Sequence, residues 1–326
     1  MKAVNIYAPY IEQYLSFKRS LGFKMITEAS VLGQFARLTN HTNPSAGITK
    51  MMSDAWYEKR TNETYSNRYA RVVHLRQFAR FLSDVGIPSY ISELPKFQRS
   101  FTPYIFSKDQ IASFFFISDQ YVPYQINYNS AYLMMPALFR LLYATGLRLG
   151  EALRLKEKDV NLAEKYLIVR QSKNGMERIV PISDSLANVC LQYQHSKKTF
   201  VRKQIASDLF FVKRDQCGCN NSTAYEAFRQ ILWRTGIPHQ GRGLGPRLHD
   251  LRHTFACHAL NAMAESGLDL YHSLPVLSVY LGHQSLAATN KYVRLTSEIF
   301  PDLLKTVNDT CGFIFPSLKN IDNETH

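Results

Sequence analysis

Closely spaced prolines divide this chain after its first quarter. Pro88, Pro95 and Pro103 fall in one short stretch, and proline interrupts a helix because it lacks an N–H and its ring clashes with the preceding turn. Apolar residues recur at helical spacing on both sides of this stretch. With 326 residues, 45% of them hydrophobic, the chain can bury two separate cores. We therefore predict a domain over residues 1–87, a linker over 88–105, a second domain over 106–312 and a tail over 313–326.

The first domain is expected to be entirely helical. The apolar pattern predicts helices at about 6–20, 27–40, 50–60 and 65–84. The last of these is the most regular, with apolar residues every three or four positions. Its remaining positions are rich in arginine: Arg68, Arg71, Arg76 and Arg80.

The charge of the chain favours a polyanionic partner. The formal net charge is +13, and the first hundred residues hold fourteen Lys and Arg against seven Asp and Glu. Such an excess suits nucleic acid better than a small acidic substrate, although general solubility is the plain alternative. We expect the arginine row of the last N-terminal helix to contact the DNA backbone, and the alternative for any one of these arginines is a solvated basic face.

The second domain is expected to be mostly helical with a small β-hairpin. Ser107 and Gln110 have the spacing of a capping box that opens a helix. Asn174-Gly175 is a strong hairpin signal between two strand-like segments. The expected helices are about 107 onward, 129–144 with a bend at Pro136, 149–155, 184–196 and 222–235, and the expected strands are 166–170 and 177–182. The predicted fold class is mainly α.

Charged and aromatic residues far apart in the sequence form a set that suits a phosphodiester. His249 and Arg252 are three apart and would project from one face of a helix. Arg148 lies far upstream, and His283 and Tyr292 follow downstream. Arginine's planar fork can bind two phosphate oxygens at once, so two such forks can stabilise the charge of a phosphoryl transfer. A tyrosine can serve as the covalent nucleophile.

These motifs together resemble those of the tyrosine recombinase (phage integrase) family. The resemblance rests on residues 144–151, on His249-Asp250-Leu251-Arg252-His253, and on Leu281-Gly282-His283 with Tyr292 nine positions later. Order and spacing both agree. The resemblance implies an N-terminal helical core-binding domain of the SAM-like kind, which covers one face of the duplex. It also implies a mixed, mostly helical catalytic domain with a small β-sheet.

The resemblance also implies a role for each residue of the set. Tyr292 would form the 3′-phosphotyrosine link, Arg148 and Arg252 would hold the nonbridging oxygens, and His249 and His283 would assist. Glu151 would hold the guanidinium of Arg148 from behind. Lys173, on the hairpin, would donate a proton to the leaving 5′ oxygen. We assign His253 and His258 to structural roles. The sequence does not say which group accepts the tyrosine proton.

Other segments suggest how this chain differs from the family. Residues 264–274 predict a connection longer than the family's compact turn, with a helix beginning at Pro275. Apolar residues recur from Ile299 to Val307, and this helix could pack within the chain or on a neighbouring protomer. The run from 274 to 281 resembles that of transposon-encoded members.

The cysteine pattern and the hydropathy indicate a protein of the cytoplasm. Five cysteines without a disulfide spacing suit a reducing compartment, and Cys217 and Cys219 are too close together for a usual zinc site. We find neither a signal peptide nor an apolar run long enough to span a membrane, and no membrane partner is expected.

The sequence therefore predicts a site-specific DNA recombinase or integrase, with DNA transposition as one use. It would act on double-stranded DNA as a tetramer on two sites, through a Holliday junction, and would be a monomer or weaker oligomer off DNA. An accessory recombinase or a DNA-bending protein is a candidate partner. No metal, ATP or other cofactor is expected. The alternatives are a type IB topoisomerase, which religates the same strand, and a catalytically inactive DNA-binding accessory protein.

Overall fold

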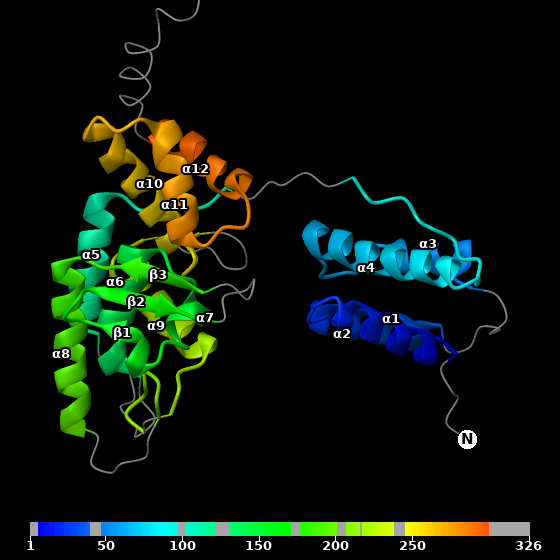
Figure 1. Ribbon diagram of the computed structural model, residues 1–326, viewed down its shortest axis with the longest axis horizontal. Helices are drawn as coiled ribbons and strands as arrows, with labels where there is room; N and C mark the ends of the chain where they lie inside the picture. The colour runs from blue at the N-terminus through cyan, green and yellow to red at the C-terminus, as the bar shows by residue number, and fades with distance from the viewer. Residues whose placement is uncertain are drawn as a thin grey trace, which may run out of the picture. The chain divides into compact units, whose positions relative to one another are not determined.

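The chain forms two compact units, Met1–Phe101 and Thr102–His326 (Figure 1). The computed structural model describes residues 6–39, 47–96, 102–121, 131–170, 177–200, 207–215, 217–237 and 245–299. The border between the units lies inside the expected linker. The start of that linker is packed on the N-terminal unit, because the Tyr90 N–H donates to the Ile48 carbonyl at 2.7 Å. Directly after the expected linker, the Phe106 N–H donates to Thr254 Oγ1 at 3.1 Å.

The N-terminal unit is a four-helix structure, close to its prediction. Its helices are α1 (Ala8–Ser20), α2 (Ile26–Leu38), α3 (Lys50–Tyr57) and α4 (Tyr65–Asp84). Thr49 and Thr64 begin α3 and α4, because each hydroxyl accepts a backbone N–H three residues ahead. The core is aromatic: Phe35, Trp56 and Phe78 are fully buried, and the rings of Phe35 and Trp56 meet edge to face at 5.4 Å.

Arg71 is part of this core, so our prediction that it contacts DNA is wrong. Its side chain is buried, and its Nε and Nη2 donate to the two carboxylate oxygens of Glu63 at 2.7 Å each. Nη1 donates to the Trp56 carbonyl, and Nη2 also donates to the Glu58 carbonyl at 2.9 Å. The arginine row of α4 spans more than one face of the helix, and Arg71 lies on the face that packs against α3.

The other three arginines of the row differ in exposure. Arg80 is exposed, whereas Arg68 and Arg76 are half-buried. Arg68 Nε donates to the Tyr57 carbonyl at 2.8 Å, and its guanidinium lies 4.5 Å from the Tyr57 ring centre. A contact of Arg68, Arg76 and Arg80 with DNA stays a prediction.

The second unit is mainly helical around a small antiparallel sheet, as predicted. The sheet has the order β1-β2-β3, and Leu167 of β2 pairs with Val180 of β3. The elements are α5 (Lys108–Asp119), η1 (Tyr132–Met134), α6 (Met135–Thr145), α7 (Leu149–Ala152), η2 (Glu157–Asp159), β1 (Val160–Asn161), β2 (Tyr166–Val169), β3 (Arg178–Pro181), α8 (Asp184–Phe200), α9 (Asn221–Arg234), α10 (Asp250–Glu265), α11 (Leu270–Leu281) and α12 (Leu286–Ile299).

The capping box predicted from sequence is present, whereas the predicted effects of two prolines are wrong. The capping box of Ser107 and Gln110 is present, with both reciprocal hydrogen bonds. Pro136 does not bend a helix: it lies in the first turn of α6, where its missing N–H needs no partner. The long connection before Pro275 is also wrong, because α11 begins at Leu270 and contains that proline. In its first turn, Ser273 donates both its N–H and its hydroxyl to the Asp269 carbonyl at 2.9 Å.

Helices α10, α11 and α12 form a separate layer at one end of this unit (Figure 1). They share a small apolar core that includes Leu260, Leu277, Leu281 and Tyr292. A larger core lies between the sheet and helices α5, α6, α8 and α9. Helix α10 packs against both α6 and α12, so it joins the two layers.

The described residues form neither a membrane-spanning helix nor a cluster of metal ligands. No helix among them is long and apolar enough to cross a membrane. No group of His, Cys, Asp or Glu in the same ranges is arranged to hold a metal ion. The described cysteines Cys190, Cys217, Cys219 and Cys257 are all free.

The buried position of Arg71 predicts a large effect on stability. Replacing Arg71 by methionine leaves the Glu63 carboxylate and two backbone carbonyls without their donor, and breaking one side of a buried ion pair typically costs about 3 kcal/mol. We expect this loss in urea unfolding followed by the fluorescence of the buried Trp56. The matched exposed variant, Arg80→Met, should change the free energy of unfolding by about 0.5 kcal/mol or less. Equal stabilities of the two variants would contradict this placement.

Candidate active site

Two turns that contain glycine hold Arg252 in place. Gly146 ends α6 with φ +60°, and Gly282 follows α11 with φ +66°. A Cβ on Gly146 would lie 2.6 Å from Leu281 Cδ2 and 2.7 Å from Phe255 Cδ1, so the close approach of α6, α10 and α11 requires glycine there. Arg252 Nη1 donates to the Gly146 carbonyl at 2.6 Å, and Nη2 donates to the Leu281 carbonyl at 2.8 Å.

These contacts explain why a buried guanidinium is tolerated here. Arg252 is only 2% exposed. Carbonyl groups at a helix C-terminus carry partial negative charge, and α6 and α11 both present theirs to Arg252. Burial, with the charge of Arg148 next, lowers the pKa of Arg252 to about 10, so it stays charged at neutral pH. Two of its five N–H donors are used in these bonds, which leaves capacity for an anion.

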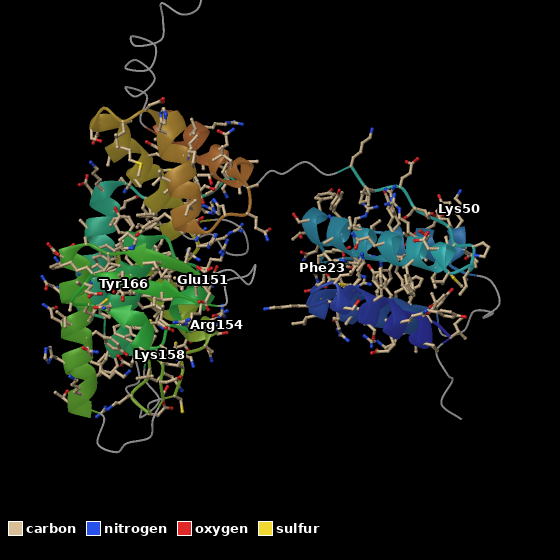
Figure 2. The ribbon with its side chains drawn as sticks, in the orientation of Figure 1. Phe23, Lys50, Glu151, Arg154, Lys158 and Tyr166 are labelled. Atoms are coloured by element: carbon tan, nitrogen blue, oxygen red, sulfur yellow. The ribbon has the colours of Figure 1, made fainter. Side chains whose placement is uncertain are left out.

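Arg148 reaches the same site from the start of α7. Its Nη1 donates to Glu151 Oε1 at 2.7 Å, and its backbone N–H donates to Glu151 Oε2 at 3.1 Å. Glu151 lies on α7 in the second unit (Figure 2), and its side chain is buried. Burial alone would raise the pKa of Glu151, but the hydrogen bonds and charge of Arg178 and the hydrogen bonds from Arg148 outweigh it and lower the pKa to about 2. The carboxylate is therefore a fixed anion that orients the Arg148 guanidinium.

Both predicted histidines are neutral at pH 7. Burial, with the charge of Arg252 next, lowers the pKa of His249 to about 4, and the same two causes in the same order lower that of His283 to about 4. A hydrogen bond of 2.7 Å joins His283 Nδ1 to Thr289 Oγ1. Because Thr289 is buried on α12, this bond fixes the His283 ring beside Tyr292, with their ring centres 6.1 Å apart.

Tyr292 is fully buried on α12, and its hydroxyl contacts His253. A hydrogen bond of 2.8 Å joins the Tyr292 hydroxyl to His253 Nδ1. Lys291 lies over the Tyr292 ring at 4.9 Å. Burial, only partly offset by the charge of Arg252, raises the pKa of Tyr292 to about 12. The phenol is therefore neutral and is held away from solvent.

His253 is the site residue that our sequence analysis missed, because we gave it a purely structural role. Burial and then the charges of its neighbours lower its pKa to about 2. Its ring meets the ring of His249 at 4.8 Å, edge to face. The signal was available: His249 and His253 are four apart and share one face of α10.

The predicted set is brought together by several different elements. Arg148, His249, Arg252, His283 and Tyr292, here named the Arg252 cluster, come from the start of α7, from α10, from the turn after α11 and from α12. Lys173 lies outside the described residues. So do the residues of the expected C-terminal helix after Ile299.

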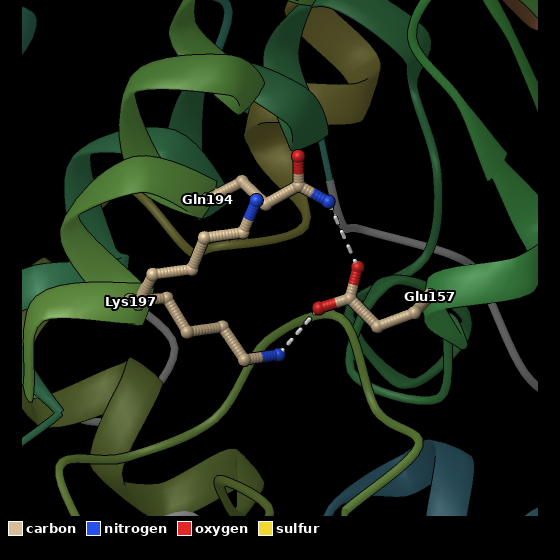
Figure 3. Close-up of a pocket in the computed structure, with 4 residues that line it drawn as sticks. Glu157, Gln194 and Lys197 are labelled. Carbon is tan, nitrogen blue, oxygen red and sulfur yellow. Dashed lines mark hydrogen bonds and ion pairs between the residues drawn. The ribbon is translucent and has the colours of Figure 1, made fainter. Parts of the chain in front are cut away.

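A separate pocket beside α8 shares no residue with this cluster (Figure 3). It is lined by Glu157, Gln194, Lys197 and Lys198. Glu157 accepts hydrogen bonds from Lys197 Nζ at 2.6 Å and from Gln194 Nε2 at 3.2 Å, and Lys197 Nζ also donates to the Leu209 carbonyl at 2.7 Å. These bonds hold α8 against η2 and against the segment before α9. They therefore stabilise the fold and involve no residue of the Arg252 cluster.

Two charged guanidiniums, neutral imidazoles and a phenol form a site for an anionic, tetrahedral or trigonal-bipyramidal phosphorus centre. The arginines supply fixed positive charge, and the imidazoles can accept or donate a proton. The phenol is a nucleophile once its proton is removed.

The buried neutral histidines predict a loss of stability in acid. In the unfolded chain histidine protonates near pH 6.5, whereas His249 and His283 stay neutral in the folded protein down to about pH 4, and His253 down to about pH 2. The unfolded state therefore binds more protons as the pH falls from 6.5 to 4, and stability is lost across this window. We expect the calorimetric melting temperature of the full chain to fall steeply there, and less steeply after His253→Gln. The exposed control, His272→Gln, should keep the slope of the original protein; equal slopes in all three would contradict the burial of His253.

Comparisons with known proteins agree with this geometry. Residues 106–298 match the phage integrase family. A Sinorhizobium fredii protein described as an integrase/recombinase, y4rB, is 30% identical over 316 residues, covering 90% of this chain and 95% of that protein. The tyrosine recombinase XerD of Listeria innocua is 28% identical over 239 residues, covering 72% of this chain and 73% of XerD.

Solved structures show the same fold. The XerH site-specific recombinase bound to its difH substrate has a TM-score of 0.65 at 16% identity, covering 86% of this chain and 78% of that one. The Tn1549 transposon integrase with transposon right end DNA has a TM-score of 0.62 at 15% identity, covering 90% and 99%. With the family match spanning more than half of its length and the site motifs in order, the chain belongs to the phage integrase family, that is, to the tyrosine recombinases.

Proposed function

We propose that this protein is a site-specific DNA recombinase that cuts and rejoins DNA through a covalent tyrosine link. The observation that carries the proposal is the convergence of the Arg252 cluster around one buried phenol, within a chain of the tyrosine recombinase family. Arg252 and Arg148 both lower the pKa of Tyr292 through their charge, which places positive charge next to the nucleophile. A phosphodiester is the substrate that this set fits best.

In the first step the Tyr292 oxygen attacks the scissile phosphorus. The bond from phosphorus to the 5′ oxygen breaks, which leaves a 3′-phosphotyrosine and a free 5′ hydroxyl. Arg148 and Arg252 hold the nonbridging oxygens, and His249 and His283 assist proton movement. Lys173 is proposed to protonate the leaving 5′ oxygen. In the second step, a 5′ hydroxyl of the partner duplex attacks the phosphotyrosine and the bond from phosphorus to the Tyr292 oxygen breaks. The tyrosine oxygen regains a proton as the attacking hydroxyl loses one, so one phosphodiester is exchanged for another and no ATP is needed.

The buried phenol implies that DNA binding rearranges the site. Tyr292 has no exposed surface, so it cannot reach a phosphate as it lies against His253. The pKa of the phenol is about 12 and that of His253 about 2, so His253 does not accept the proton in this arrangement. We propose that His253 holds the phenol in a resting position beside Arg252, and that an entering phosphate breaks the hydrogen bond between Tyr292 and His253.

The proposed substrate is double-stranded DNA, and the proposed active form is a tetramer on two sites that passes through a Holliday junction. Support for a DNA substrate comes from the basic N-terminal unit, where Arg68, Arg76 and Arg80 remain candidates for backbone contacts. XerH and the Tn1549 integrase were both solved with DNA. An enzyme that acts on DNA in this way would work in the cytoplasm, alone or with an accessory recombinase or a DNA-bending protein.

The test is recombination between two copies of the cognate site in buffer with EDTA. We expect recombinant products from the original protein and none from Tyr292→Phe, while both bind DNA equally because the phenylalanine ring fills the same apolar space. Tyr10→Phe, which removes an exposed hydroxyl in the N-terminal unit, should recombine normally.

Relaxation of supercoiled DNA in the same reactions separates the alternatives. Relaxation without recombinant products would indicate a type IB topoisomerase. DNA binding with neither reaction, on a cognate site, would indicate an accessory protein. Recombination by Tyr292→Phe would rule out the proposed nucleophile.

A further inference from the structure

Arg178 is a half-buried arginine that the proposed mechanism does not use. It is the first residue of β3, where it pairs with Val169 of β2. Its side chain is only 10% exposed, although most arginines keep their charge in water. A guanidinium is costly to bury, so its partners indicate what it does.

The first partner of Arg178 is the carboxylate that holds Arg148. Arg178 Nη2 donates to Glu151 Oε2 at 2.9 Å, while Arg148 Nη1 donates to Glu151 Oε1 at 2.7 Å. One buried carboxylate therefore lies between two guanidiniums. Hydrogen bonds and charge from Arg178 contribute more to lowering the pKa of Glu151 than those from Arg148. Without Arg178, Glu151 would be a buried anion with one cation only.

The second partner of Arg178 is the end of α11, which holds Arg252. Arg178 Nε donates to the Tyr280 carbonyl at 3.0 Å, and the next carbonyl in the chain, that of Leu281, accepts from Arg252 Nη2 at 2.8 Å. Tyr280 returns the contact, because its hydroxyl donates to the Pro181 carbonyl at the other end of β3 at 3.0 Å. Strand β3 and the end of α11 are thus joined twice.

The turn after α11 is shaped around this guanidinium. A Cβ on Gly282 would lie 2.8 Å from Arg178 Nη1 and 3.0 Å from its Cζ. Among the described residues, Nη1 of Arg178 has no hydrogen-bond partner, and an unpaired buried N–H costs free energy. The guanidinium therefore does not lie where its own bonding would be best satisfied. It lies where Nε and Nη2 reach α11 and Glu151 together.

We propose that Arg178 is a positioning residue that fixes the two phosphate-binding arginines relative to each other. It reaches Arg148 through Glu151 and Arg252 through adjacent carbonyls of α11, and this route needs no contact of Arg178 with the substrate. The inference rests on the proposed function, because it concerns the geometry of phosphate binding. A planar fork suits this task, since its separate N–H groups point at fixed angles to two partners.

The test is the single-turnover rate of covalent adduct formation on a nicked duplex that traps the phosphotyrosine. Arg178→Met should slow adduct formation about 10- to 100-fold, the range typical when a group that orients a ligand is lost. DNA affinity, measured separately, should be unchanged. Arg178→Lys should recover part of the rate, because an ammonium can pair with Glu151 but lacks the fork that also reaches the Tyr280 carbonyl. The matched control is Arg170→Met, which removes an exposed arginine next to β2 that pairs with Asp159 and Glu177.

A second measurement separates positioning from general stability. If Arg178 acts on Arg148 through Glu151, the double variant Glu151→Gln/Arg178→Met should form the adduct at nearly the same rate as the slower of the two single variants. If the rate losses of the two single variants multiply in the double variant, the proposed route is wrong. A normal rate of adduct formation for Arg178→Met would also overturn it.

If Arg178→Met does not fold, the lysine variant decides: an adduct-formation rate equal to that of the original protein overturns the inference. An original protein that forms no adduct on its cognate site would overturn the proposed function and this inference with it, whereas normal variants beside an active original protein would overturn the inference alone.

Discussion

The site depends on one buried arginine held between the C-terminal ends of two helices. Arg252 donates to the carbonyls of Gly146 and Leu281, and these bonds join α6, α10 and α11 around a single charge. Glycine in the two turns makes the approach possible, because a Cβ would clash at Gly146 and at Gly282. Since the anchoring uses backbone carbonyls at helix ends, other donors of the guanidinium remain for an anion. The fold therefore fixes the position of the charge that we propose binds the phosphate.

The electrostatic state of the cluster follows from this burial. Burial, and then the positive charge of Arg252, lowers the pKa values of His249 and His283, so both imidazoles are neutral. The guanidiniums of Arg148, Arg178 and Arg252 share one buried carboxylate, Glu151, so this part of the site carries excess positive charge, which a phosphodiester would offset. Burial also keeps Tyr292 protonated. The free protein therefore holds the proposed nucleophile buried against His253, and we attribute its activation to the arrival of the phosphate.

Much of this structure could be predicted from sequence, where local signals decide. The helices of the N-terminal unit, the capping box at Ser107 and the antiparallel hairpin strands follow from periodicity and from capping residues. The sequence singles out Arg148, Arg252 and Tyr292 because their motifs have fixed spacing. The errors arise where tertiary contacts decide. Helical periodicity did not reveal that Arg71 would pair with Glu63.

The same limit applies to His253 and Arg178. Nothing local distinguishes His253 from any histidine on a helix until α12 places Tyr292 against it. Arg178 looks like an ordinary strand arginine until β3 meets the end of α11. Pro275 predicts the start of a helix because proline is common in the first turn of helices. In the structure α11 already begins at Leu270, where hydrogen bonds from Ser273 to the Asp269 carbonyl stabilise its first turn.

The most direct test of the central claim is to map the residue that becomes linked to DNA. The protein would be incubated in EDTA with a nicked duplex carrying its cognate site, digested with protease, and the DNA-bound peptide sequenced by mass spectrometry. The account predicts a single adduct on the peptide that contains Tyr292, with DNA attached through its 3′ phosphate. An adduct on a different residue, or a 5′ linkage, would contradict it.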